Sequence, residues 1–189
     1  KEFPEINLFS ASRNEVDITR SETIKNFYSK NPFDGIINCA AYTNVEQAEK
    51  EVESVFKINT EGLQNLIDFA ENKNISIINF SSDYVFDGES SEPYPEKAVS
   101  NPIGIYGESK LKGEILLSKG SSNNVTIRTS WIFSPFGKNF VKTITHLAKE
   151  KSDLKVVEDQ WGRPTYGIDL ARTILRLIST NKIYTFPIL

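Results

Sequence analysis

A tyrosine and a lysine stand four residues apart in the segment Tyr106-Gly107-Glu108-Ser109-Lys110. If the segment is helical, this spacing puts both side chains on one face, one turn apart. A lysine ammonium beside a phenol favours the phenolate and lowers the tyrosine pKa, so the pair could protonate an oxygen that gains negative charge at a carbonyl. Tyrosine and lysine at this spacing also occur on ordinary solvated helices, so the pattern gains weight only from its context.

Ser82 supplies part of that context. It follows the apolar run 75–80 and precedes the Tyr-Lys pair. Two hydroxyls that meet at one carbonyl oxygen would form a small oxyanion site. Small and polar residues also follow two other apolar runs, as Ala40-Ala41-Tyr42-Thr43 and Ser130-Trp131. The alternative is ordinary loop polarity, since Ser, Asp and Tyr are common at strand ends.

Short apolar runs alternate with helical periodicity along the chain. This alternation predicts βαβ units and an α/β fold with a doubly wound parallel sheet. Ligands of such sheets bind beyond the carboxyl ends of the strands, where the polar segments would lie. The expected strands are 6–9, 34–39, 75–80, 125–129 and a shorter 154–157. The expected helices are 52–70, 168–178, an amphipathic 139–150, one starting near Tyr106 and a weaker 21–28.

The composition is that of an ordinary globular protein. The 189 residues carry a net charge of -3 with no basic block, which gives no reason to expect nucleic-acid binding. No apolar run approaches the ~20 residues that would span a membrane. The single cysteine suits a reducing cytoplasm, and one cysteine with one histidine gives a metal site little support. The chain contains no methionine and starts at Lys1.

A set of further motifs follows the same order as the residues above. They are Asn38-Cys39-Ala40-Ala41-Tyr42-Thr43, Ser82-Asp83-Tyr84-Val85-Phe86-Asp87-Gly88, Asn101-Pro102, Arg128-Thr129-Ser130-Trp131, Gly137-Lys138-Asn139-Phe140, and Asp159-Gln160 with Gly162, Pro164 and Thr165. In these stretches the chain resembles the dTDP-4-dehydrorhamnose reductase family of the extended short-chain dehydrogenase/reductase superfamily, which has a Rossmann-like, NAD(P)-binding fold. The likeness runs from about residue 17 to about residue 178.

The resemblance implies an enzyme that reduces the 4-keto group of dTDP-4-dehydrorhamnose to give dTDP-L-rhamnose. NADPH or NADH would supply the hydride, and the protein would supply position and polarity. Tyr106 would donate the proton, and Lys110 would tune it and bind the nicotinamide ribose. Ser82 would hold the carbonyl, at a position where the family more often has threonine.

The resemblance also implies binding residues. Asp17 and Ile18 would border the adenine, and Ala40, Ala41 and Thr43 would line the cofactor's path, beside Tyr106 and Lys110. The residues expected around the sugar nucleotide are Asp83, Tyr84, Trp131, Asn139, Gln160, Arg163 and Thr165. Arg163 could meet the diphosphate, because a guanidinium matches phosphate oxygens bidentately.

Asn59 is a polar residue on an apolar helical stripe, between Phe56 and Leu63. One interpretation is a core amide whose hydrogen bonds are satisfied by the backbone. The other, suggested by the superfamily, is a cofactor-site residue that supports the active site from behind. The two interpretations weigh about equally.

The family pattern begins with a strand and a glycine-rich turn that seats the cofactor pyrophosphate on a helix N-terminus. No GxGxxG or GxxGxxG occurs in this sequence, and the run 6–9 looks like the family's second strand. We therefore expect residues 1–130 to form a dinucleotide-binding core without its N-terminal portion. Residues 131–189 would add substrate-lining segments with a closing strand and helix, and would not form an independent domain.

Two other functions remain open from the sequence. A non-catalytic, NADP-binding regulator is one, because the regulatory subunit of methionine adenosyltransferase has a similar fold and an SSDYVFDG-like segment. A related sugar-nucleotide epimerase or dehydratase is the other. The family often forms homodimers, but nothing in the sequence indicates one here.

Overall fold

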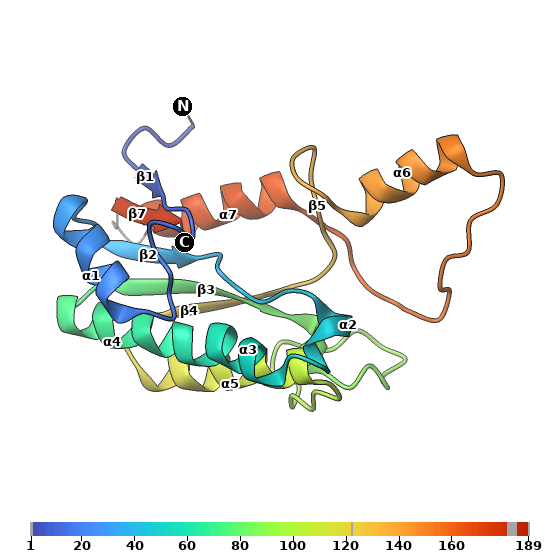
Figure 1. Ribbon diagram of the computed structural model, residues 1–189, viewed down its shortest axis with the longest axis horizontal. Helices are drawn as coiled ribbons and strands as arrows, with labels where there is room; N and C mark the ends of the chain where they lie inside the picture. Colours follow the sequence, from blue (N-terminus) through green and yellow to red (C-terminus); the bar gives the residue numbers. More distant parts are fainter. Residues whose placement is uncertain (1, 122, 181–184, 189) are drawn as a thin grey trace.

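Five parallel strands form the central sheet of the computed structural model, which describes residues 2–121, 123–180 and 185–188 (Figure 1). The strand order is β1-β7-β2-β3-β4, and every pair is parallel. The strands are β1 Asn7–Ser10, β7 Thr185–Ile188, β2 Gly35–Asn38, β3 Ser76–Ser82 and β4 Val125–Thr129. A second, two-stranded parallel sheet pairs β5 Ile132–Phe133 with β6 Thr165–Tyr166.

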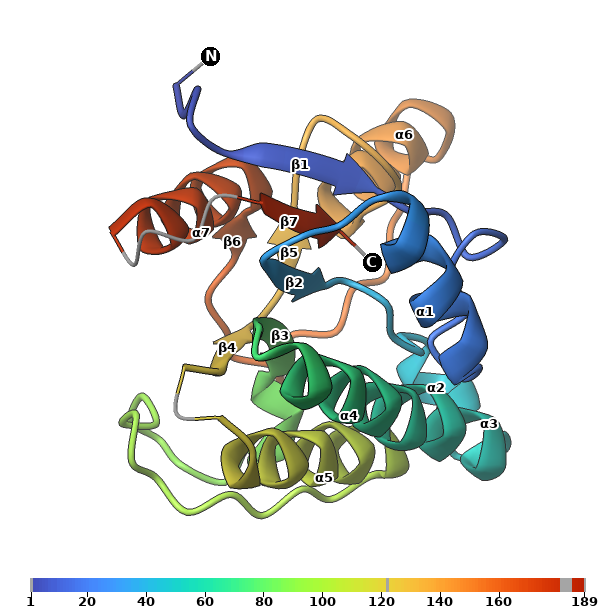
Figure 2. The ribbon, with the colours of Figure 1, turned by 90° about the vertical axis from the view of Figure 1, so that its left-hand side faces the viewer.

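Helices cover both faces of the sheet (Figure 2). One face carries α1 Ser21–Lys30, α4 Leu63–Lys73 and α5 Ile105–Lys119, and the other carries α7 Gly167–Thr180. Neighbouring residues of β2 and β3 point to opposite faces, so each strand is buried on both sides and forms a continuous apolar run. Ile36 and Ile77 pack under α1 and α4, whereas Ile37 and Ile78 pack under α7. The predicted doubly wound parallel sheet is confirmed.

The predicted helix 52–70 contains a change of winding in its middle. It consists of α3 Val52–Phe56, the π-helical segment η1 Lys57–Gly62 and α4. Single π-helical turns inside α-helices are frequent at functional sites. Gly62 lies in this segment because a Cβ there would be 2.8 Å from the Ile18 side chain. The remaining short helices are α2 Val45–Ala48 and η2 Asp83–Val85, and α6 Phe140–Glu150 is a longer one.

Two strand expectations differ from the structure. The strand predicted at 154–157 is wrong: this segment has no strand partner, and Val156 and Val157 are exposed. The sheet also has a strand that the sequence did not single out. β7 lies between β1 and β2 and pairs with both, which satisfies backbone groups that the two strands would otherwise leave unpaired.

Candidate active site

The three polar segments predicted to share one edge of the sheet do so. Asn38 of β2 is paired with Asn79 of β3, and Ser82 of β3 is paired with Thr129 of β4. Because the strands are parallel, their carboxyl ends lie at the same edge. The Asn38 amide donates to Asn79 Oδ1 at 2.8 Å, so the two central strands are also tied by side chains where the edge begins.

Tyr106 and Ser82 come together at this edge. Tyr106 lies in the first turn of α5, and Ser82 ends β3. Ser82 is close enough to the phenol to lower its pKa as a hydrogen-bond partner. The Ser82 hydroxyl also donates to Asp83 Oδ1 at 3.0 Å and accepts from the Tyr84 amide at 3.2 Å, which fixes its position. The Tyr84 ring packs edge-on against Tyr106, with 5.6 Å between ring centroids.

Lys110 lies one turn further along α5 and is only 7% exposed. Burial lowers the pKa of its ammonium to about 8, and the negative charge of Glu114 opposes this shift. The pKa of Tyr106 is raised, chiefly by burial and then by Asp83 and Tyr84, against the lowering effect of Ser82. The prediction that Lys110 lowers the Tyr106 pKa is therefore wrong for this structure, because burial outweighs the other effects on the phenol.

The N-terminus of α5 is held by residues that the sequence did not identify. A Cβ on Gly107 would lie 2.1 Å from the Tyr84 carbonyl oxygen, so only glycine allows this close contact between α5 and η2. Glu49 accepts a hydrogen bond from the Ile105 amide at 2.9 Å and caps the helix, since Gly104 has no side chain to do so. Glu49 belongs to the charged run 46–53, whose sequence gives no signal of this role beyond its charge.

The predicted cofactor residues fall into different environments. Ala40, Ala41 and Thr43 follow β2 at the sheet edge, and the Ala40 amide donates to Asn38 Oδ1 at 3.1 Å. Ile18 is 4% exposed and belongs to the hydrophobic core. Only its main chain is therefore placed to meet a ligand, and its carbonyl already accepts from Asn65. The carboxylate of Asp17 accepts from the hydroxyl and amide of Thr19.

The chemistry of the donor set fits a nicotinamide cofactor at this edge. The Lys110 ammonium can donate three hydrogen bonds. Among the described residues no side chain or carbonyl accepts one from it, so its donors are available to the hydroxyls of a ribose. Asn59 supports the same edge: its amide oxygen accepts from the Tyr42 amide at 2.8 Å, next to Ala41.

The predicted substrate residues form a second group next to β4. Trp131 is 45% exposed with a left-handed φ of 47°, and its carbonyl accepts from the Thr165 amide at 3.2 Å. The Ser130 hydroxyl donates to the Arg163 carbonyl, and Thr129 and Thr165 share a side-chain hydrogen bond. The 160–165 segment is therefore held against the end of β4.

Three other predicted substrate residues are placed differently. Gln160 is exposed at the start of the 160–165 segment. Asn139 caps α6, where its oxygen accepts from the Lys142 amide and its nitrogen donates to the Ser134 carbonyl. Both ends of its amide are thus used in this structure. Asp83 faces the edge through its hydrogen bond from Ser82.

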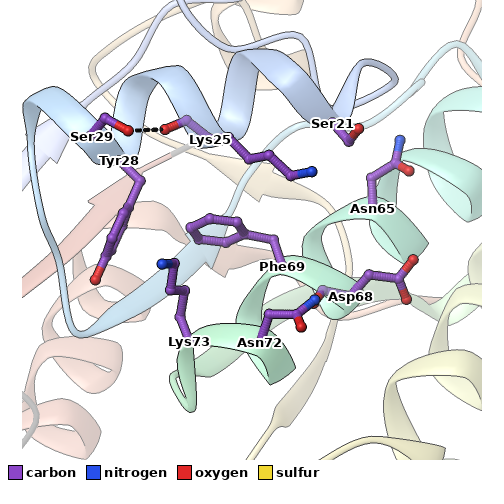
Figure 3. A pocket seen from close by; sticks show the side chains of 9 residues that line it. All are labelled: Ser21, Lys25, Tyr28, Ser29, Asn65, Asp68, Phe69, Asn72 and Lys73. Atoms are coloured by element: carbon purple, nitrogen blue, oxygen red, sulfur yellow. Dashed lines mark hydrogen bonds between the residues drawn. The ribbon is translucent and has the colours of Figure 1, made fainter.

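A separate groove of about 590 Å³ lies between α1 and α4 (Figure 3). It is lined by Ser21, Lys25, Tyr28, Ser29, Asn65, Asp68, Phe69, Asn72 and Lys73. None of the predicted site residues lines this groove, so it is separate from the candidate active site. Among the described residues no cluster of three or more His, Cys, Asp or Glu could hold a metal ion. No helix in the described part of the chain is long and apolar enough to cross a membrane.

A family model and two curated relatives match most of the chain. The model of the RmlD substrate binding domain family matches residues 2–185. The chain is 43% identical over 163 residues to a dTDP-4-dehydrorhamnose reductase of Aggregatibacter actinomycetemcomitans, covering 86% of this chain and 55% of that protein. It is 36% identical over 183 residues to the same reductase of Sinorhizobium fredii, covering 95% of this chain and 62% of that protein.

A solved structure of a protein with the same name has a similar fold. The dTDP-4-dehydrorhamnose reductase of Bacillus anthracis in complex with NADP superposes with a TM-score of 0.87 at 36% identity, covering 96% of this chain and 65% of that one. The chain thus spans a little over half the length of the curated relatives, 55% and 62%.

Proposed function

Because the chain belongs to the RmlD substrate binding domain family, we propose that it carries the catalytic edge of an NAD(P)H-dependent reductase of dTDP-4-dehydrorhamnose. The observation that carries the proposal is the meeting of Ser82 and Tyr106 at one sheet edge, with Lys110 buried one turn behind the phenol. The relative solved with NADP supports that cofactor.

The bound cofactor supplies the hydride, and the residues of this chain supply the proton and the geometry. Tyr106 donates its phenolic proton to the oxygen of the 4-keto group as that oxygen becomes an alkoxide. Its raised pKa keeps the phenol protonated at neutral pH and ready to donate. Ser82 donates a hydrogen bond to the same oxygen and orients the carbonyl. Lys110 would hold the nicotinamide ribose through the hydrogens of its ammonium.

The sugar nucleotide binds on the β4 side of the edge in this proposal. Trp131 and Tyr84 are exposed there and offer aromatic surface, at 45% and 41% exposure. Arg163 supplies the positive charge for the diphosphate. The single Cys39 is compatible with a reducing cytoplasm, and we extend the proposal to that location. Sedimentation of the full-length protein would decide whether it forms the homodimer that the family resemblance suggests.

The test is Tyr106→Phe in the full-length protein, with NAD(P)H absorbance followed on dTDP-4-dehydrorhamnose. We expect a loss of roughly 10²–10⁴-fold in turnover, with the cofactor still bound. Tyr28→Phe, in the groove between α1 and α4, removes a phenol oxygen away from this edge and should keep normal turnover. Normal turnover in Tyr106→Phe would refute the assignment. Cofactor binding without any turnover in the parent protein would favour the non-catalytic regulator.

A further inference from the structure

An ion pair lies beneath Lys110 and outside the set of residues assigned to the reaction. Arg128 of β4 binds Glu114 of α5 through two hydrogen bonds, Nε to Oε1 at 3.0 Å and Nη2 to Oε2 at 2.7 Å. The Glu114 side chain is 11% exposed and that of Arg128 is 30% exposed. A bidentate, largely dry pair of this kind is stronger and better defined than a surface pair.

Arg128 is held in place by more than Glu114. Its Nη2 also donates to the Ser100 hydroxyl at 3.0 Å, and its guanidinium lies 5.0 Å from the centre of the Phe86 ring. Both contacts come from the segment between η2 and α5, which leads into the catalytic helix. These contacts with the segment between η2 and α5 fix the position of the guanidinium. The Glu114 carboxylate is therefore held next to β4.

Glu114 and Lys110 are four residues apart on α5, so their side chains lie on the same helical face. Both are buried, at 9% and 7% exposure, and charge interactions are strong where water is excluded. A free carboxylate at this spacing would pair with the lysine ammonium and keep it charged. The two hydrogen bonds from Arg128 occupy both oxygens of that carboxylate.

We propose that Arg128 and Glu114 act as positioning residues that set the protonation of Lys110, with Arg128 withholding the Glu114 carboxylate from the lysine. The Glu114 carboxylate, held on Arg128, then raises the pKa of Lys110 less than burial lowers it. The low pKa of Lys110, with burial as its main cause and Glu114 as its only opposing charge, is consistent with this arrangement.

The other ionisable groups on the elements around Lys110 are mostly exposed. α5 carries Tyr106 and the exposed Glu108 and Lys112, and η2 brings Asp83 and Tyr84. α2 brings the exposed Glu46, followed by the exposed Glu49. α3 brings the exposed Glu53 and η1 the exposed Lys57 and Glu61, while β3 brings none. α4 brings the exposed Asp68, Glu71 and Lys73. Among all of these and Arg128, Glu114 is the group whose charge shifts the pKa of Lys110.

The experiment titrates Lys110 directly in the full-length protein. Lysine-labelled protein is followed by carbon–nitrogen NMR of the side-chain ammonium across pH, and Lys110→Arg identifies its signal. In Arg128→Gln the carboxylate is released, and the Lys110 pKa should rise by about one pH unit. In Glu114→Gln the guanidinium remains without its counter-charge, and the pKa should fall by a similar amount. The double variant removes both charges, and its Lys110 pKa should lie between those of the two single variants.

Shifts of the Lys110 pKa in opposite directions in the two single variants distinguish this proposal from a purely structural role of the ion pair. If the pair only packs α5 on β4, either variant loosens the helix and the Lys110 pKa rises in both. As a control, Arg172→Gln on α7 breaks an exposed ion pair with Glu2 and should leave the Lys110 pKa unchanged. Should Arg128→Gln fail to fold, the sign in Glu114→Gln decides alone. An unchanged or raised pKa in Glu114→Gln would overturn the proposal.

The expected effect of these variants on turnover rests on the proposed function, whereas the titration of Lys110 does not depend on it. If the reductase assignment holds, the pH profile of kcat/KM moves with the Lys110 pKa in each variant. Opposite shifts of the pKa without any reductase activity would refute the proposed function and leave the role of the ion pair standing.

Discussion

The Asn59 amide nitrogen donates to the Ser109 hydroxyl at 2.9 Å, and this bond joins η1 to α5 between Tyr106 and Lys110. The Ser109 hydroxyl in turn donates to the Tyr106 carbonyl at 2.7 Å. The Asn59 amide also accepts from the Tyr42 amide and donates to the Tyr42 carbonyl, at 2.8 and 3.2 Å. Its hydrogen bonds are thus satisfied within the protein, two of them by the backbone as the first interpretation predicted, and they tie the loop after β2 to α5.

Asn59→Ala should destabilise the fold and weaken the site together. It leaves the half-buried Tyr42 amide without its partner, which costs about 1–3 kcal/mol of unfolding free energy. Urea unfolding of the variant measures this loss. Asn72→Ala removes an exposed amide on α4 and should change stability by less than about 0.5 kcal/mol. Equal effects of the two substitutions would show that the buried network contributes nothing.

Gly107→Ala should displace α5 from η2. The new Cβ would lie 2.1 Å from a backbone oxygen, which cannot rotate away, so the helix must move. We expect a loss of roughly 1–3 kcal/mol in stability and about 10²-fold in turnover, because Tyr106 moves with the helix. Gly104→Ala meets only the exposed Glu49 carboxylate, at 3.0 Å, and should be milder. A fully active Gly107→Ala would contradict the close contact.

The sheet and its edge could be predicted from the sequence because both depend on local patterns. The apolar runs 34–39 and 75–80 are buried on both faces and read as continuous strands, and the polar segments after them share an edge by topology alone. The run at 154–157 failed because an apolar stretch becomes a strand only where a neighbour pairs with it. β7 was not singled out, since its position depends on the gap between β1 and β2.

The residues that hold the site were harder to predict, because they act across long sequence separations. Glu49 caps a helix that begins 56 residues later, and no local sequence pattern predicts this contact. Arg128 was noticed in its motif, but its bond to Glu114 on α5 follows from the packing of α5 on β4. The pKa of Tyr106 depends on burial, which the spacing of Tyr106 and Lys110 does not report.

Burial of Lys110 should make stability depend on pH in a defined window. Its pKa is about 8 in the folded protein against an ordinary 10.5, so the unfolded chain binds more protons between these values. Stability therefore rises with pH across this window, and the cost of burying the lysine, roughly 3 kcal/mol, is present below it. Lys110→Met should be more stable than the parent at pH 7.

The measurement is the difference in unfolding free energy between Lys110→Met and the parent, taken at several pH values. Contributions of other groups cancel in that difference, which should shrink as pH rises from about 8 toward 10.5. Lys112→Met, at an exposed lysine of the same helix, reports the effect of the substitution itself. A difference that stays constant with pH would mean that Lys110 keeps its ordinary pKa.

Gly162→Ala should move Trp131. A Cβ at Gly162 would lie 2.7 Å from the indole atoms Cε2 and Cζ2, so the ring must leave its present position on the 160–165 segment. The chain has two tryptophans, and Trp131 can be followed alone by fluorescence in a Trp161→Phe background. We expect a red-shifted emission as the indole becomes more exposed than its present 45%. In the full-length protein KM for the sugar nucleotide should rise, with kcat less affected, because our proposal places Trp131 on the substrate side. Gly167→Ala, at the first residue of α7, serves as the control, since its new Cβ meets its neighbours at an ordinary 3.5 Å. An unchanged emission in Gly162→Ala would show that the indole does not rest on this glycine.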